Sequence, residues 1–111
     1  MSRHDRERLE DILAAIDAIR GHLGRGDLTD GLVFDAVRVR LIEIGAAVKA
    51  LADELLSQQP EVPWGQIAAM RDRLAHRYFD ISHAILTATV EQDLPELDRA
   101  ARTLLHLIAR D

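Results

Sequence analysis

The sequence predicts an all-α protein, folded as a five-helix up-and-down-type bundle of a single domain over residues 1–111. Apolar residues recur every three or four positions through most of the chain, which is the period of an amphipathic helix. The composition is rich in Leu, Ile and Ala, whereas aromatic residues make up only 4%, and this mixture favours helices over strands. Short segments with Gly or Pro separate the periodic stretches, and the pattern contains neither a repeat nor a second domain.

Two long helices are expected in the first half of the chain. The first runs over residues 5–23 and ends where a glycine-rich turn follows. The second runs over residues 30–57, with Thr29 or Asp30 as its N-cap. Gly45 lies in the middle of this second helix, where glycine costs about 1 kcal/mol relative to alanine. We therefore expect the backbone of another element to pack closely against Gly45.

A third helix follows a linker with two prolines. Pro60 and Pro63 interrupt the apolar pattern, and Pro63 is suited to the start of a helix because its missing amide is not needed there. The helix is expected from Trp64 to about Ala75. Trp64 is expected to lie in the core.

Two further helices complete the predicted bundle. The fourth ends near Glu91 and begins at a cap, either Asp80 or Ser82. Its inward residues are expected to be Ile81, Ile85 and Val90. The segment Asp93-Leu94-Pro95-Glu96 has the spacing of a capping box, so we expect a separate fifth helix from there to about Ala109.

Composition indicates a soluble, cytoplasmic protein. The chain has no cysteine, which excludes disulfides and fits an intracellular location. Its N-terminus lacks the apolar core of a signal peptide, and no apolar run is long enough to span a membrane. The net charge of −5 argues mildly against bulk electrostatic binding of nucleic acid, although it does not exclude a local basic site.

One segment, residues 70–80, concentrates groups that can perform chemistry. Arg71, His76 and Tyr78 form the pattern R-x4-H-x-Y in a locally basic stretch of an acidic chain. Histidine titrates near neutral pH and can serve as an acid or a base, whereas arginine stays charged and can hold a phosphate. Residues five apart lie on different faces of a regular helix, so Arg71 and His76 can converge only through a distorted helix end or a second copy of the chain.

The same residues also have ordinary structural explanations. Arg71 and Arg73 can be solvated charges at a helix C-terminus, where cations are favoured. His76 can be a capping or packing residue, and Tyr78 an ordinary half-buried aromatic. Spacing alone does not decide between these roles and a functional site. No set of metal ligands is visible, since the chain lacks cysteine and has no i,i+4 histidine pair, and no cofactor is expected.

Nearly the whole chain resembles the HepT-like toxins of the HEPN superfamily. Four segments carry the resemblance: Ala36-Val37 leading to Ile44-Gly45, Pro60-Glu61-Val62-Pro63-Trp64, residues 70–80 with the R-x4-H-x-Y pattern, and Glu91-Gln92-Asp93-Leu94-Pro95. The resemblance implies a metal-independent ribonuclease toxin of a type VII toxin–antitoxin pair. It implies a homodimer in which the two R-x4-H motifs face each other in a cleft.

The resemblance also implies the residues and partners of the site. Arg71 and His76 would be catalytic. A small nucleotidyltransferase antitoxin of the MntA type would silence the toxin by adding AMP to Tyr78. RNA would be the substrate, and Arg73 and Arg77 are candidates for contacts with flanking phosphates because arginine pairs well with them.

The sequence departs from the family pattern at one position. The family commonly has Gly-Glu-Ala on the long helix, whereas this chain has Gly45-Ala46-Ala47. A carboxylate that often lies near the site is therefore absent at Ala46. This absence and the acidic net charge favour one alternative, a catalytically weak HEPN module that mainly binds a nucleotidyltransferase partner. The intact motif argues against another alternative, a helical scaffold without a site.

Overall fold

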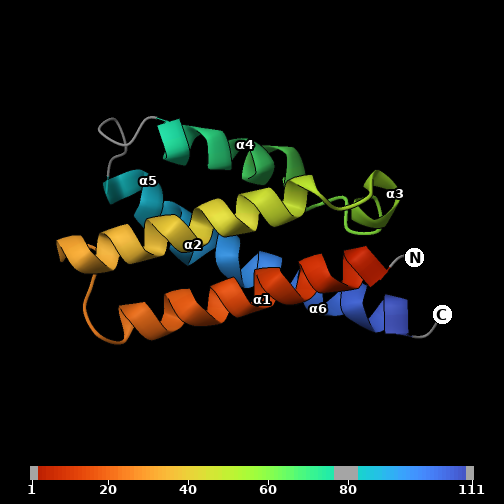
Figure 1. The fold of residues 1–111 in the computed structure, drawn as a ribbon, viewed down its shortest axis with the longest axis horizontal. Helices are drawn as coiled ribbons and strands as arrows, with labels where there is room; N and C mark the ends of the chain where they lie inside the picture. The colour runs from red at the N-terminus through yellow and green to blue at the C-terminus, as the bar shows by residue number, and fades with distance from the viewer. Residues whose placement is uncertain (1–2, 77–82, 110–111) are drawn as a thin grey trace.

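The computed structural model describes residues 3–76 and 83–109, with the backbone alone for His76 and His83. Figure 1 shows a bundle without strands in the described part of the chain. Its helices are α1 (Arg3–Leu23), α2 (Gly31–Lys49), α3 (Asp53–Leu56), α4 (Trp64–His76), α5 (His83–Ala88), the π-helical turn η2 (Thr89–Asp93) and α6 (Leu94–Ala109). The all-α five-helix prediction is confirmed, because α1, α2, α4, α5 and α6 correspond to the five expected helices. None of the helices in the described ranges is long and apolar enough to cross a membrane.

Helix α2 is the central element of the bundle. It packs against α1 on one side and α4 on the other, and α6 packs against α1 (Figure 1). Asp30 caps the start of α2, as predicted, because its carboxylate accepts from the amides of Leu32 at 2.9 Å and Val33 at 3.4 Å. Its interior position makes α2 the element that sets where α4 lies.

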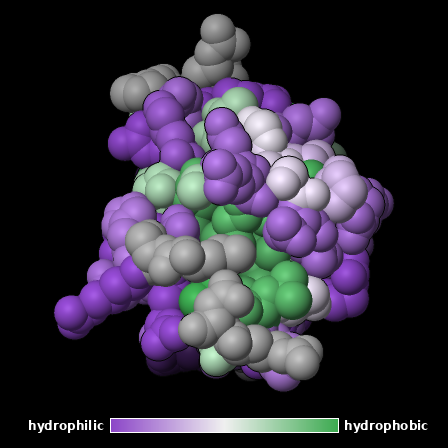
Figure 2. Space-filling view, turned by 90° about the vertical axis from the view of Figure 1, so that its right-hand side faces the viewer, coloured by the Kyte–Doolittle hydropathy of each residue, from purple (hydrophilic) through white to green (hydrophobic). Residues whose placement is uncertain are grey.

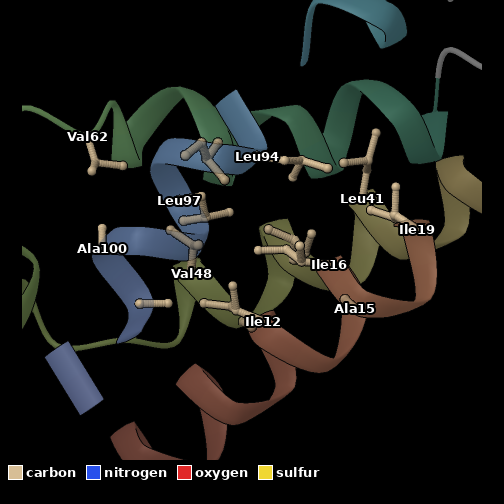
Figure 3. Packing of buried hydrophobic residues seen from close by; sticks show 14 of the residues in the cluster. Ile12, Ala15, Ile16, Ile19, Leu41, Val48, Val62, Leu94, Leu97 and Ala100 are labelled. Atoms are coloured by element: carbon tan, nitrogen blue, oxygen red, sulfur yellow. The ribbon is translucent and has the colours of Figure 1, made fainter. Parts of the chain in front are cut away.

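The core is one cluster of mostly aliphatic side chains. Figure 3 shows Ile12 and Ile16 of α1, Val48 of α2 and Leu97 of α6 gathered in the interior. Burial of each such side chain stabilises the fold by about 1.5–3 kcal/mol. Trp64 is also buried, as expected, and its indole Nε1 donates to the Gln59 carbonyl at 3.0 Å. Seen from the end where α3 lies, the surface is mostly hydrophilic around one hydrophobic area (Figure 2).

A charged cluster connects α1 to α6 at the surface. The Asp98 carboxylate accepts from Arg20 at 2.9 Å and from Arg102 at 2.8 Å. Desolvation alone would raise the pKa of Asp98, but the hydrogen bonds from the two guanidinium groups outweigh it and lower that pKa below its ordinary value. A lowered pKa means that this contact stabilises the fold near neutral pH and is lost as the carboxylate is protonated in acid.

The predicted single helix over residues 30–57 was wrong at its end. Helix α2 stops at Lys49, and a separate short helix, α3, begins at Asp53. The buried Asp5 carboxylate of α1 accepts from the Ala52 amide at 3.3 Å, and His4 Nε2 lies 3.3 Å from the Ala50 carbonyl oxygen. These contacts satisfy backbone groups that the helix break exposes, so a distant part of the chain overrides the local apolar pattern.

The predicted capping box at Asp93 was also wrong. Asp93 ends the π-helical turn, and the chain passes from α5 through η2 into α6 without leaving a helical path. The Leu94 amide donates to the Thr89 carbonyl, five residues back. Pro95 explains the widening, because its ring cannot donate and would crowd the carbonyl of Glu91, four residues earlier, in a regular α-helix.

The change of helical register also alters the inward face of this region. Ile85 was expected to face the core, but it is 45% exposed, and Leu86 takes the buried position. Val90 is half-buried against the core, in agreement with the expectation. The predicted cap at Asp80 or Ser82 and the inward position of Ile81 lie outside the described residues.

The expected close contact at Gly45 is confirmed. A Cβ atom built on Gly45 would lie 2.7 Å from Arg71 Cβ, 3.1 Å from the Ile67 carbonyl oxygen and 3.2 Å from the Arg71 amide nitrogen. Real Cβ atoms essentially never come as close as the first distance. The crossing of α2 and α4 therefore requires a glycine at this position.

Replacement of Gly45 by alanine should destabilise the fold. Overpacking of this kind lowers the free energy of unfolding by about 1–3 kcal/mol. The better helix propensity of alanine offsets about 1 kcal/mol of that loss. We expect the free energy of unfolding in urea to fall by up to about 2 kcal/mol. Gly21→Ala in α1 is the matched control, since nothing lies within 4 Å of its added Cβ, and it should not destabilise. Equal stability of the two variants would contradict the close crossing.

Candidate active site at the end of helix α4

Arg71 lies on α4 directly over Gly45 of α2. Its amide and Cβ contact the glycine, so its backbone is held inside the bundle while the side chain extends to the surface, where it is 40% exposed. Its Nη1 donates to the Asp72 carboxylate at 3.0 Å. An exposed pair of this kind contributes about 0–1 kcal/mol. An anionic ligand can therefore replace Asp72 at the Arg71 guanidinium at little cost.

Arg73 lies on a different side of α4 from Arg71. It is exposed and lines a cavity between α4 and α5, together with Met70 and Leu74. Within the described part of the chain Arg73 makes no ion pair. Two residues apart on a helix are separated by about 200°, so the two arginines of the predicted cluster serve different surfaces.

His76 is the last residue of α4, and the backbone from Arg71 to His76 is regular α-helix. Of the two routes by which Arg71 and His76 were expected to converge, a distortion of the helix between them is therefore not observed. The convergence itself remains a prediction because the His76 side chain is not described. Arg77 and Tyr78 lie outside the described residues.

Arg38 of α2 is a positioning residue that the sequence analysis missed. Its Nη1 donates to the Leu74 carbonyl at 3.0 Å. That carbonyl belongs to the last turn of α4, whose oxygens lack partners within the helix. The signal was present in the sequence, because Arg38 precedes Gly45 by seven residues, or two helical turns, and so lies on the same face of α2.

The end of α4 thus gathers positive charge. Arg38, Arg71 and Arg73 surround its last two turns, two of them with their guanidinium groups at the surface. A helix C-terminus carries partial negative charge, which favours such cations. Arg71 and Arg73 each present a guanidinium that can pair with a phosphate, on different sides of the helix. Among the described residues no group of three or more His, Asp or Glu side chains could hold a metal ion.

Ala46 is the position at which the resemblance described above implies a glutamate. It is exposed and lines a surface hollow between α1 and α2 that also contains Arg8, Asp11, Arg40 and Glu43. The Arg40 guanidinium pairs with Glu43 at 2.8 Å. The side chain of Ala46 therefore borders the α1–α2 hollow, whereas the neighbouring Gly45 contacts α4.

Comparison with known proteins identifies the family. The family model described as "Ribonuclease HepT-like" matches residues 9–104, which include Gly45, Arg71 and His76. The chain belongs to the HepT-like family. It is 35% identical over 101 residues to "Probable ribonuclease HepT" of Thermococcus cleftensis, covering 87% of this chain and 92% of that protein.

Two further relatives of the HepT-like chain carry provisional RNase names. One, from Caldanaerobacter subterraneus, is 35% identical over 91 residues, which is 81% of this chain and 80% of that protein. The other, from Methanocaldococcus jannaschii, is 30% identical over 95 residues, or 82% of each chain. No solved structure gives a significant match.

Removal of the Arg38 side chain should loosen the end of α4 in this HepT-like chain. Arg38→Gln deletes the charged donor to the Leu74 carbonyl, a hydrogen bond worth about 1.5–3 kcal/mol. We expect amide hydrogen exchange around residues 71–76 to quicken about tenfold. Arg40→Gln is the matched control, since Arg40 lies on the same helix and pairs only with the exposed Glu43 among the described contacts. Equal exchange in both variants would show that Arg38 does not hold this turn.

Proposed function

We propose that this protein is a metal-independent ribonuclease and the toxin of a type VII HepT/MntA-like toxin–antitoxin pair. The observation that carries the proposal is the intact R-x4-H pattern on α4 of a chain of the HepT-like family, with Arg71 held over Gly45. The chemistry of the two residues agrees with this. Arg71 presents a weakly paired guanidinium at the surface, and His76 follows at the end of the same helix.

The proposed reaction is an internal transfer at one RNA phosphate. A base removes the proton of the 2′-hydroxyl, whose oxygen attacks phosphorus while the bond to the 5′-oxygen breaks. An acid protonates that leaving oxygen, so the products are a 2′,3′-cyclic phosphate and a 5′-hydroxyl end. His76 supplies the acid and base chemistry, and Arg71 stabilises the charge on the phosphate. Arg73 and Arg77 contact neighbouring phosphates.

The proposed active form is a homodimer. The reaction needs an acid and a base, whereas one protomer supplies a single motif histidine. Helix α4 is regular from Arg71 to His76, and residues five apart on such a helix do not face each other. Both points support a site in which two copies meet at their α4 ends and divide the roles between two His76 side chains.

Loss of either motif residue should abolish RNA cleavage. Acid–base groups contribute about 10²–10⁴ to rate, so Arg71→Ala and His76→Ala should each reduce cleavage by at least about a hundredfold. Circular dichroism should show an unchanged fold. Arg99→Ala is the control, because Arg99 is exposed and the only ion pair of its guanidinium among the described residues is with Glu61, at 4.0 Å. The wild type should remain active in EDTA.

A second candidate function is a catalytically weak module that mainly binds a nucleotidyltransferase. The observation that favours it is Ala46, which leaves the long helix without the family carboxylate. The cleavage assay separates the two functions. Intact RNA after incubation with the purified wild type, together with harmless expression, would favour the binding module and contradict the toxin.

Tyr78 is the proposed acceptor of AMP from the antitoxin, and it is the only tyrosine of the chain. The adduct would place bulk and phosphate charge two residues after His76, where it would repel the RNA phosphate and compete for the motif arginines. Incubation with a cognate nucleotidyltransferase and ATP should raise the intact mass by AMP units at Tyr78 and suppress cleavage. Tyr78→Phe should remain active under the same conditions. Equal silencing of Tyr78→Phe would mean that the antitoxin acts by binding alone.

A further inference from the structure

A cavity of about 260 Å³ lies between α4 and the α5–η2 region, on the Arg73 side of the motif helix. Apolar side chains form its walls, and polar groups stand among them. The apolar walls include Ile67, Met70, Ile85 and Leu86. Cavities that enclose drug-sized ligands measure about 300–1,000 Å³. This one is therefore suited to a smaller ring system.

The polar groups come from both sides of the cavity. Helix α4 contributes the Gln66 amide and the Arg73 guanidinium, and η2 contributes Thr89 and Asp93. Asp93 is half-buried, and no ion pair of this carboxylate is present within the described ranges. The set thus offers a flat cationic donor, an amide that both donates and accepts, and an anionic acceptor.

The π-helical turn places Thr89 and Asp93 at the cavity. They are the first and last residues of η2, and the turn carries one more residue than a regular α-helical turn. If the same residues formed regular α-helix instead, the side chains on one side of the turn would be rotated by about 100° relative to those on the other. Widened turns of this kind often occur at functional sites, and here both ends of the turn line the same cavity.

We propose that this cavity binds one base of the RNA substrate, with guanine preferred. Proteins that read RNA sequence take up unstacked bases against apolar or guanidinium surfaces and hydrogen-bond to their edges. Guanine presents an imino and an amino N–H side by side, and the Asp93 carboxylate can accept from both. Ile67, Met70 and Leu86 supply the apolar walls for the ring faces. The Gln66 amide completes recognition of the base edge.

The cavity lies close to the proposed reaction along α4. Arg73 precedes His76 by three residues, which is about 4.5 Å of helix axis. A base in the cavity therefore belongs to a nucleotide next to the scissile phosphate, with Arg73 near the phosphate that links them. The placement of the base beside the scissile phosphate rests on the proposed ribonuclease function. Binding of a free nucleotide to the cavity does not require cleavage.

The experiment measures the binding of 5′-GMP and 5′-UMP to the full chain by titration calorimetry. The wild type should bind GMP about tenfold more tightly than UMP, since a good bidentate contact discriminates between bases by about 5- to 150-fold. Asp93→Asn should remove this preference. Glu91→Gln is the matched control, because it neutralises an exposed carboxylate of the same turn that does not line the cavity, and it should keep the preference.

A second variant tests the location without altering Asp93. Ile85 lines the cavity and is 45% exposed, so Ile85→Trp should fill the opening and block GMP while the melting temperature stays near that of the wild type. Equal affinity of GMP and UMP for the wild type would overturn the proposal. GMP binding that survives both Asp93→Asn and Ile85→Trp would overturn it as well.

The outcome is separable from the test of ribonuclease activity. Arg71→Ala should lose cleavage and keep the preference for GMP, because Arg71 does not line the cavity. If the wild type leaves RNA intact but binds GMP through Asp93, the base site stands and the ribonuclease proposal fails. If the wild type cleaves RNA with the same preference at all bases, and Asp93→Asn does the same, the ribonuclease proposal stands and the base site fails.

Discussion

The crossing of α2 and α4 at Gly45 is the contact on which the candidate site depends. Because Gly45 has no side chain, the Arg71 amide and Cβ can rest directly on α2, and the backbone of the motif is placed by the core. Two turns earlier on α2, Arg38 donates to the last turn of α4 through the Leu74 carbonyl. Helix α2 therefore holds α4 at two points of the motif segment, Arg71 and Leu74. Helix α2 is itself held by α1 and the hydrophobic core, so packing in the interior determines where the motif backbone lies at the surface.

The features of the fold that the sequence predicted are those governed by local physics. The helical period of the apolar residues predicted the five helices, and the capping preference of Asp30 predicted the start of α2. The cost of a glycine in mid-helix predicted the close contact at Gly45. The errors arose where distant residues decide the outcome. The break after Lys49 contains no glycine or proline, and it depends on Asp5, 47 residues from Ala52. The turn at Asp93 has the composition of a helix start, but the chain keeps a helical path by widening.

The candidate site was predictable to a similar extent. The pattern of residues 70–80 predicted a functional site on the helix that is α4, and comparison placed the chain in the HepT-like family. Sequence proximity grouped Arg71 with Arg73, whereas the folded chain directs them to different surfaces. Arg38 shares a face of α2 with Gly45, but it was missed because the backbone carbonyl that it contacts has no signature of its own in a sequence. The cavity was missed because it combines residues of α4 with residues of α5 and η2 that lie more than ten positions later in the sequence.

The widened turn between α5 and α6 has a consequence for how this chain can change in length during evolution. A residue deleted from the middle of α6 would rotate everything beyond it by about 100° and turn Leu104 and Ile108 out of the core. A residue deleted from Thr89–Asp93 would instead convert the wide turn into a regular one and leave the α6 core face in place. The turn is therefore a position where insertions and deletions can be absorbed. Length variation there would reshape the cavity beside α4 while the hydrophobic core stayed intact.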